Sequence, residues 1–395
     1  MKRFSICLAV LLALLCFAAL AEEAADITPQ CGIRVSHYGS DKEKMLDNGT
    51  MSMWYQPEAN AWVEVTCPQG KPAQGVFIRW GKKPIDTVIQ VPGEGKEWQT
   101  ALEHEGAYFN EYIAFDEPLE KFRIRPQAKQ DKFAIIKLQV LGEGELPDWV
   151  ERWQPFEGKA DMMVLVAHAD DELLYMGGVI PYYSGQMGKK VIVVYIAQMN
   201  GFRNVELLDG LWHCGVRSYP VMPSSKFKDQ WCNKRDTCLR LWNESTFFSY
   251  VTELIRRYQP DVIVTHDVNG EYGHGAHKAC SYAVQKCILK AADASQYPDS
   301  AAQYGPWQVK KAYLHLYQSD LGMLDFDWRQ PLDAFGGKTA FEITTEAFNM
   351  HRSQAASGKY KVEDFGKYDN SLFGLFYSSV GNDTPGVNDM FEHLE

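Results

Sequence analysis

Val164-Leu-Val-Ala-His168-Ala-Asp170-Asp171-Glu172 is the stretch that decides the fold, because an apolar run ends there in one histidine and three consecutive acids. The apolar residues 162–167 predict a strand buried on both faces, since the segment is too short for a helix. The polar cluster then follows the carboxyl end of that strand. Ligands bind at this end in open α/β sheets, so the position favours function.

An imidazole with a carboxylate is a donor set for first-row metals, and His168 and Asp171 lie three residues apart on a turn. Asp170 between them points elsewhere and is a candidate general base beside a metal site. A second interpretation stays open. The three acids also suit the N-terminus of the following helix as caps.

A second polar cluster, Thr265-His266-Asp267-Val-Asn-Gly270-Glu271-Tyr-Gly273-His274-Gly-Ala-His277, follows another short apolar run at residues 262–264. His274 and His277 are three residues apart at the start of a helical pattern that continues to residue 287. This spacing places both on one face, toward the same crevice. One of them completes a three-ligand site, and the other faces the substrate.

The two motifs, AHADDE and GEYGHGAH about a hundred residues later, resemble those of the PIG-L (LmbE-like) family of zinc-dependent N-acetylglucosamine deacetylases over roughly residues 160–390. The family motifs are AHPDDE and a GHxDH-type element. The resemblance implies a Rossmann-like LmbE fold with a mostly parallel sheet and one zinc ion per chain. It also implies roles for individual residues: His168, Asp171 and His277 as metal ligands, Asp170 as general base, and His274 as the group that stabilises the oxyanion.

The sequence departs from the family pattern at two positions. Ala169 replaces the proline of the first motif, which removes no donor atom, so we expect little effect. Ala276 replaces the aspartate of the second motif. If that aspartate orients the neighbouring histidine in the family, His274 lacks this partner here. The pKa of His274 and its contribution to catalysis are then left open.

Alternating helices and strands predict parallel βαβ units after the first motif. We expect helices at 173–187, 247–258 and 341–354, strands at 190–197 and 311–317, and a long loop over the crevice at 218–243. Arg203 lies in a segment that resembles the family's and is a candidate for binding substrate hydroxyls, although a solvated surface charge is the alternative. His315 is interpreted as structural and His351 as a support residue, with a place in the substrate pocket left open.

The first 21 residues have the pattern of a secretory signal peptide: Lys2 and Arg3, then an apolar run, then a small-residue site before Glu22. An uncleaved membrane anchor is the alternative. We expect a secreted or periplasmic protein with no transmembrane segment after cleavage. Loss of the two basic residues changes the net charge from −11 to −13, so no nucleic acid partner is expected.

Seven cysteines follow the signal segment, at positions 31, 67, 214, 232, 238, 280 and 287. Export permits disulfides, and the pairs to test first are Cys31 with Cys67 and Cys232 with Cys238. None has the spacing of a structural zinc site.

Composition changes near residue 150, where short alternating segments separated by Pro/Gly turns give way to the α/β pattern. The earlier part predicts an all-β jelly-roll sandwich and weakly resembles a discoidin-like domain. We expect a sandwich at 22–145, a linker at 146–158 and the LmbE-like domain at 159–395. Trp149 and Trp153 are expected to pack the two domains together. Discoidin-like domains often bind carbohydrate, so Trp54, Tyr55 and Trp98 are candidates for stacking on a cell-surface sugar, with core packing as the alternative.

These features predict an exported hydrolase that removes the acetyl group from an N-acetylated sugar or glycan. We expect the sandwich to contribute binding but no chemistry, because His37 and His104 there lack a metal-like cluster. Two alternatives remain. The protein is a metal hydrolase of another amide or conjugate, or it is a secreted carbohydrate-binding protein with little catalytic activity.

Overall fold

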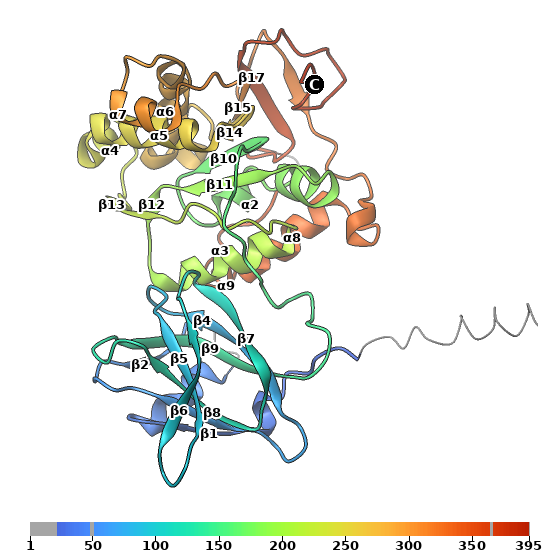
Figure 1. Cartoon of the computed structure of the whole chain (residues 1–395). Coiled ribbons are helices and arrows are strands. Elements are labelled where there is room, and N and C mark those ends of the chain that lie inside the picture. Colours follow the sequence, from blue (N-terminus) through green and yellow to red (C-terminus); the bar gives the residue numbers. More distant parts are fainter. Residues whose placement is uncertain (1–21, 48–50, 364–365, 395) are drawn as a thin grey trace, which may run out of the picture.

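The computed structural model describes residues 22–47, 51–363 and 366–394, which form two domains (Figure 1). The lower one is all-β and the upper one is α/β. The expected signal peptide, residues 1–21, lies outside the described residues. Among the described helices, none has the length and apolar character needed to cross a membrane.

The N-terminal domain consists of two antiparallel sheets packed face to face. The first has the strand order β1-β3-β8-β5-β6 and the second β2-β9-β4-β7. The strands are β1 (Gly32–Val35), β2 (Trp54–Gln56), β3 (Val63–Thr66), β4 (Ala73–Trp80), β5 (Thr87–Pro92), β6 (Trp98–His104), β7 (Asn110–Leu119), β8 (Lys121–Pro126) and β9 (Phe133–Gly142), with the short 3-10 helices η1 (Thr28–Gln30) and η2 (Gly39–Met45). The expected β-sandwich is confirmed.

Alternating apolar side chains from both sheets fill the core of the sandwich, as the period-2 pattern predicts. Trp54 belongs to this core: it is fully buried, and its ring centroid lies 5.9 Å from that of Phe133. The suggestion that Trp54 stacks on a sugar is therefore wrong. Trp54 is the first residue of β2, which has only three residues. An alternating pattern over three residues is too short to predict which side chains face the core. Tyr55 and Trp98 are half-buried.

The α/β domain is built on a six-stranded sheet with the order β11-β10-β14-β15-β17-β16. Strands β10 (Met162–Val166), β11 (Val191–Tyr195), β14 (Val262–Thr265) and β15 (Lys311–His315) are parallel, whereas β17 (Leu372–Ser378) and β16 (Met323–Asp325) add antiparallel to one edge. Strands β12 (Ala197–Gln198) and β13 (Ser224–Lys228) form a separate parallel pair. The mostly parallel, Rossmann-like sheet is confirmed.

Helices cover both faces of this sheet, and the alternation along β10 shows why. Val164 and Val166 pack with α3 (Gly201–His213) and α8 (Ala340–Met350) on one face, whereas Leu165 packs with α4 (Arg235–Trp242), α5 (Glu244–Tyr258) and α6 (Gly275–Ala292) on the other. The remaining helical elements are α2 (Asp171–Leu174), α7 (Pro298–Tyr304), α9 (Arg352–Ala355), the π-helical η3 (Pro181–Gln186), and the 3-10 helices η4 (Glu271–Gly273) and η5 (Asp333–Phe335).

Three expected elements differ from the structure. The single helix at 173–187 is wrong, because α2 ends at Leu174 and η3 begins only at Pro181, beyond two glycines that have no room for a side chain. The loop at 218–243 is also wrong, since it contains β13 and α4. The helix expected at 341–354 is interrupted at His351, whose φ and ψ of −76° and 61° are not helical.

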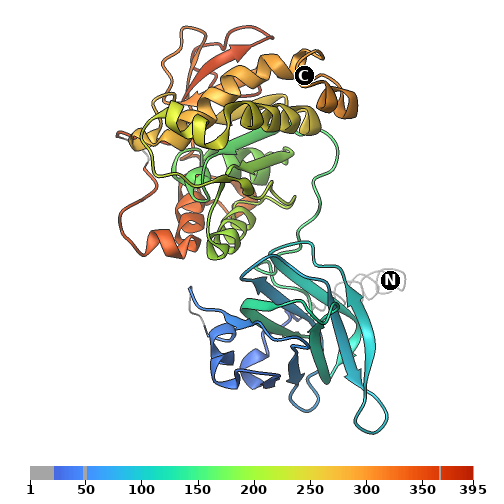
Figure 2. The ribbon, with the colours of Figure 1, turned by 90° about the vertical axis from the view of Figure 1, so that its left-hand side faces the viewer.

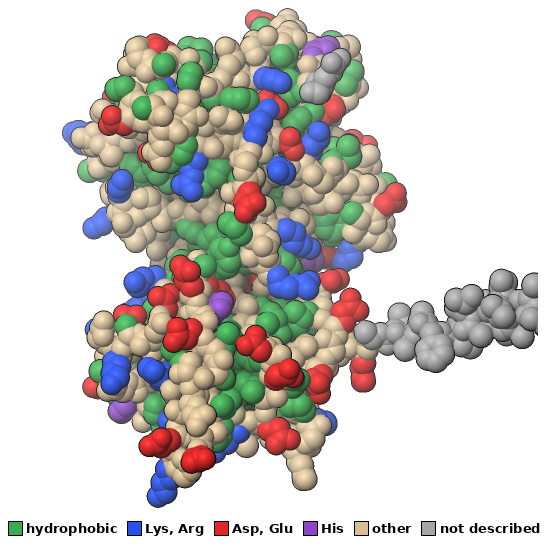
Figure 3. Space-filling view, viewed as in Figure 1, with side chains coloured by type: hydrophobic (Ala, Val, Ile, Leu, Met, Phe, Trp, Pro, Cys, Tyr) green, Lys and Arg blue, Asp and Glu red, His purple; other side chains and the backbone are tan. Residues whose placement is uncertain are grey.

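The connection between the domains passes Trp149 and Trp153, as expected, and Figure 2 shows it along one side of the molecule. Trp149 packs edge-on against Phe77 of the sandwich, with ring centroids 5.9 Å apart. Trp153 packs against Trp212 of α3 at 5.3 Å. On the face drawn in Figure 3, carboxylate side chains gather over the sandwich, the lower half of the view. This accords with the formal net charge of −11, and such a surface repels polyanions.

Candidate metal and catalytic site

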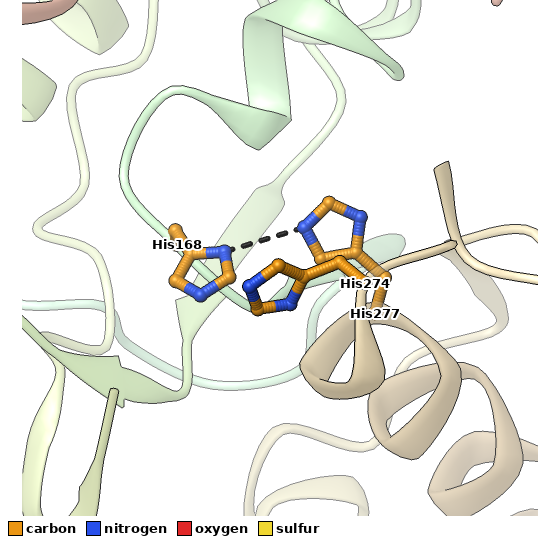
Figure 4. A group of neighbouring side chains, drawn as sticks. All are labelled: His168, His274 and His277. Atoms are coloured by element: carbon orange, nitrogen blue, oxygen red, sulfur yellow. Dashed lines mark hydrogen bonds between the residues drawn. The ribbon is translucent and has the colours of Figure 1, made fainter. Parts of the chain in front are cut away.

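The two polar motifs meet at a point where the strand order reverses. The chain leaves β10 for β11 on one side and returns to β14 on the other. The crevice at the carboxyl ends of such neighbours is the usual ligand site of an open α/β sheet. His168 and Asp171 follow β10, and His277 lies in the first turn of α6. Figure 4 shows the imidazoles of His168, His274 and His277 facing one another.

Three donor atoms converge within this crevice. His168 Nδ1 lies 3.1 Å from Asp171 Oδ2 and 3.3 Å from His277 Nε2, and the last two atoms are 3.3 Å apart. Ligand atoms at about 2.0–2.2 Å from a tetrahedral zinc ion lie about 3.3–3.6 Å from one another. The three atoms therefore fit three corners of a zinc coordination tetrahedron, and the fourth corner is left for water or substrate.

A carboxylate orients each of the two histidines. Glu271 Oε2 accepts from His277 Nδ1 at 2.8 Å, and Asp229 Oδ1 accepts from His168 Nε2 at 3.1 Å. The other nitrogen of each ring then faces the shared centre, where it could bind a metal ion in its unprotonated form. Carboxylate–histidine pairs of this kind fix the tautomer and raise the basicity of a metal ligand.

Two other groups of donor atoms lie within 4.8 Å of one another, one containing His274 and one containing His266. In both, the added histidine has a nitrogen that already accepts a backbone N–H. His274 Nδ1 accepts from Ala276 at 3.2 Å, and His266 Nε2 accepts from Ala167 at 3.0 Å. A neutral imidazole has one accepting nitrogen, so neither ring has a second one for a metal. This favours His168, Asp171 and His277.

Glu271 is the centre of the hydrogen-bond network beneath the site. Its buried carboxylate contacts Nδ1 of three imidazoles, at 2.7 Å for His266, 2.8 Å for His277 and 2.8 Å for His315. Burial opposes ionisation, but His266 beside it holds the pKa of Glu271 well below its usual range. The structural interpretation of His315 accords with this place, since its other nitrogen faces the Asp369 carbonyl at 2.8 Å.

Asp170 has a strained backbone, with φ of 116° in a region that side chains other than glycine rarely adopt. Glu172 stabilises this conformation, because its Oε2 accepts the Asp170 N–H at 2.8 Å. The second oxygen of Glu172 lies 3.1 Å from His351 Nε2. His351 thus supports the turn as expected, from a fully buried position.

The Asp170 side chain faces Arg203, with Arg203 Nη2 2.8 Å from Asp170 Oδ1. Burial raises the pKa of Asp170 to about 6 even though the guanidinium opposes the rise. Burial also acts against ionisation of Asp171, but His277 and His168 hold the pKa of that carboxyl well below its usual range. The two adjacent acids therefore differ in proton affinity, as an acid–base group and a metal ligand should.

Arg203 makes contacts that the sequence did not suggest. Besides the ion pair with Asp170, it donates a hydrogen bond to the Ala169 carbonyl, and its side chain is only 14% exposed. The guanidinium is thus bound to the first motif. The alternative of a solvated surface charge does not describe it, and its role as a ligand of substrate hydroxyls stays a prediction.

His274 retains a defined tautomer despite the alanine at position 276. The Ala276 backbone N–H occupies Nδ1, so the ring proton lies on Nε2. Burial lowers the pKa of His274 to about 4, and His168 nearby acts in the same direction. The ring is therefore neutral near pH 7 and offers one N–H donor to the crevice.

Three polar residues of the site had no role in the sequence interpretation. Glu271 and Tyr272 lie inside the second motif, between its histidines, and this position could have identified them as site residues from the sequence. The Tyr272 hydroxyl lies 3.4 Å from His277 Nε2. Asp229 comes from the segment after β13, and nothing in the local sequence connects it with His168, from which it is 61 residues distant.

The segment that carries both motifs matches a known protein family. Residues 163–288 match the PIG-L family, described as GlcNAc-PI de-N-acetylase. They form a PIG-L family domain. A 1D-myo-inositol 2-acetamido-2-deoxy-alpha-D-glucopyranoside deacetylase of Frankia casuarinae is 27% identical over 175 residues. The match spans 37% of this chain and 56% of that protein, little more than half its length.

Two solved structures are also similar in part. The N,N'-diacetylchitobiose deacetylase of Pyrococcus horikoshii is 19% identical with a TM-score of 0.37, covering 49% of this chain and 71% of that one. An F5/8 type C domain from Bacteroides fragilis is 18% identical with a TM-score of 0.25, covering 31% of this chain and 97% of that one.

Proposed function

We propose that this protein is a zinc-dependent hydrolase that removes the acetyl group from an N-acetylated sugar. The observation that carries the proposal is the convergence of His168 Nδ1, Asp171 Oδ2 and His277 Nε2 within 3.1–3.3 Å beside the buried Asp170. The family domain at 163–288 supports the amide substrate. Two neutral imidazoles and one carboxylate suit one zinc ion with an open coordination position.

A bound zinc ion would supply Lewis acidity toward water and the amide carbonyl. Asp170 accepts the proton of the attacking water: it is the neighbour in sequence of the proposed ligand Asp171, and burial raises the pKa of its carboxyl to about 6. His274 donates its Nε2 proton in a hydrogen bond to the carbonyl oxygen as negative charge develops there. Protonated Asp170 then returns the proton to the leaving amine, and acetate and the free amino sugar result.

The substrate extends beyond one sugar ring in our proposal. Trp231 is 82% exposed, yet its ring centroid lies 5.9 Å from that of His274. The ring centroid of Tyr272 lies 5.5 Å from that of His274 and 6.1 Å from that of Tyr360. Exposed aromatic faces at the mouth of a site stack on the apolar faces of pyranose rings. A second sugar ring of a glycan would lie on Trp231 while the acetylated ring occupies the crevice.

Two further parts of the proposal rest on the sequence. Export to the periplasm or medium rests on the pattern of residues 1–21, and sequencing the N-terminus of protein recovered from the medium tests it. Binding of a cell-surface carbohydrate by the sandwich rests on its half-buried aromatics. Trp98 is the strongest of these, although Arg123 stacks on it at 4.1 Å.

The deciding experiment measures acetate release from N-acetylglucosamine, its oligomers and glycoconjugates, with and without a chelator. We expect release that chelation abolishes and that zinc restores. Release of acetate from none of the sugars, with turnover of another amide, would identify a different amide hydrolase. Sugar binding without any turnover would leave only the carbohydrate-binding alternative. Matched assays of His168→Ala show whether turnover depends on the proposed ligands.

A further inference from the structure

The sandwich contacts α3 of the α/β domain, the helix that faces it in Figure 1. The first residue of α3 is Gly201, and a Cβ atom added there would overlap the carbonyl oxygen of Gly81. Gly81 follows β4 and is itself fixed, because its N–H donates to the Ala134 carbonyl at 2.6 Å. Backbone thus meets backbone at the start of α3, with no flexible side chain between.

A buried polar network fixes the same helix two turns farther along. Arg79 of β4 donates to Asp209 of α3 at 3.0 Å, and the amide nitrogen of Asn110 of β7 lies 3.0 Å from the same carboxylate oxygen. The Asn110 nitrogen also lies 2.9 Å from both oxygens of Glu151, which belongs to the interdomain connection. Asn110 is fully buried, and the hydrogen bonds to the Asp209 carboxylate are charge-assisted and therefore strong.

Arg203 stands between these two points of attachment. Its guanidinium lies 2.8 Å from Asp170 Oδ1 and donates to the Ala169 carbonyl. A rigid helix that is fixed at residues 201 and 209 has little freedom at residue 203. The position of the sandwich relative to α3 therefore determines where Arg203 meets the strained turn of the first motif.

We propose that the β-sandwich is a positioning element of the catalytic site, which acts through α3 and Arg203 on Asp170. The inference rests on the proposed function, and it replaces the expectation that the sandwich contributes binding but no chemistry. Gly81, Asn110 and Gly201 are positioning residues, since none of them touches the reacting atoms. A displacement of about 1 Å in a reacting group costs on the order of 10²-fold in rate, so small movements of α3 matter.

The test compares Gly201→Ala with Gly39→Ala in the full-length protein. An alanine at position 201 must displace α3 from Gly81. At Gly39, which is exposed, an added Cβ meets nothing within 4 Å. Alanine is the better helix former by about 1 kcal/mol, so helix propensity does not explain a loss at position 201. Asn110→Ala serves as a second variant if Gly201→Ala does not fold.

Hydrogen exchange over residues 167–173 is the first measurement, and it does not depend on turnover. We expect faster exchange there in Gly201→Ala and Asn110→Ala, and wild-type exchange in Gly39→Ala. The second measurement is acetate release. The kcat should fall about tenfold or more, while zinc content and KM remain near those of the wild type.

A double-mutant cycle with Arg203→Ala shows the route. If α3 acts through Arg203, Gly201→Ala should cause no further loss of kcat in the Arg203→Ala protein. The inference would be overturned if the losses of kcat in the two single variants multiplied in the double variant. It would also be overturned if both interface variants folded and showed wild-type exchange and wild-type kcat. A wild-type protein that releases no acetate contradicts the proposed function alone, and the exchange comparison still decides whether the sandwich positions the turn.

Discussion

The Glu271 carboxylate accepts the Nδ1 proton of His277 at 2.8 Å and thereby leaves Nε2 of the same ring to face His168 Nδ1 and Asp171 Oδ2, each at 3.3 Å. Glu271 is fully buried, and its pKa is held well below its usual range by His266, although burial opposes this. The carboxylate is thus ionised whenever the protein is folded near pH 7. The proposed ligand His277 thus depends on Glu271, a residue that had no role in the sequence interpretation.

Replacing Glu271 with glutamine should weaken zinc binding about 10- to 100-fold, the usual cost of losing an outer carboxylate partner. Competition with a chromogenic chelator measures the change. Asp229→Asn is the matched control, because Asp229 contacts the other histidine but its side chain is 43% exposed, so the loss should be smaller. Equal zinc affinity in Glu271→Gln and wild type would contradict this role.

The sequence predicted those parts of the site that follow directly from strand ends. His168, Asp171 and His277 converge because parallel strands β10 and β14 end at the same edge of the sheet. Asp229 was not predictable, since its contact with His168 depends on how the segment after β13 returns over the crevice. The contact of Arg203 with Asp170 also depends on tertiary packing, namely the angle at which α3 leaves the sheet.

The fold was predictable to a similar extent. Period-2 patterning identified the sandwich, and buried apolar runs identified the central strands of the α/β sheet. The helix expected at 173–187 is interrupted after Leu174, and Gly177 and Gly178 lie in this interruption where Thr344 and Trp328 approach from distant parts of the chain and leave no space for a Cβ. The periodicity of apolar residues reflects the geometry of one helix or strand. It gives no information about contacts with residues distant in sequence.

Asp170 and Asp171 should respond differently to substitution. Asp170→Asn should keep the metal and lose about 10²-fold or more in kcat, the typical cost of removing a general acid–base group. Asp171→Ala should lose the metal itself. Metal content and kcat are measured on the same preparations. If both variants keep zinc and near-normal rates, neither acid has the role proposed for it.

Trp231→Ala should raise KM for an N-acetylglucosamine oligomer while leaving kcat and the turnover of the monosaccharide nearly unchanged. Loss of one stacking contact is worth roughly 0.5–1.5 kcal/mol, which corresponds to a change in KM of about 2- to 13-fold. Trp231→Phe retains an aromatic face and should recover part of the loss. Equal effects on oligomer and monosaccharide would mean that no second ring lies on Trp231.

The two proposed cysteine pairs are adjacent in the structure, although all seven described thiols are free. Hydrogen bonding to Cys67 raises the pKa of Cys31, and the same contact lowers that of Cys67. Burial and Cys232 raise the pKa of Cys238. Oxidised protein should contain both disulfides, each formed with loss of two protons and two electrons to an added oxidant such as oxidised glutathione.

Peptide mass mapping before and after reduction identifies these disulfides. The bond between Cys31 and Cys67 should stabilise the sandwich by roughly 3–4 kcal/mol, because it closes a loop of several tens of residues. Cys31→Ser should therefore lower the stability of oxidised protein and leave that of reduced protein nearly unchanged. A crosslink of either cysteine to a different partner would contradict the adjacency seen here.

Glu151 should make stability depend on pH. Burial raises its pKa well above the usual range, and Asp209 acts in the same direction while Arg79 opposes it. The folded protein thus binds a proton that the unfolded chain has already released above about pH 4.3. Above about pH 4.3 the folded state therefore binds more protons than the unfolded state. The contribution of Glu151 to the free energy of unfolding is fully present below that pH and decreases as the pH rises through the higher pKa of the folded state.

Glu151→Gln removes the titration but keeps an oxygen that accepts from Asn110 and Trp153, which contact Glu151 at 2.9 and 2.6 Å. The free energy of unfolding of the variant should therefore rise relative to wild type as pH increases from 5 to 8. Urea denaturation at several pH values measures the difference. A constant difference across this range would show that Glu151 is ionised in the folded protein throughout, with Arg79 and Asn110 outweighing the effect of burial.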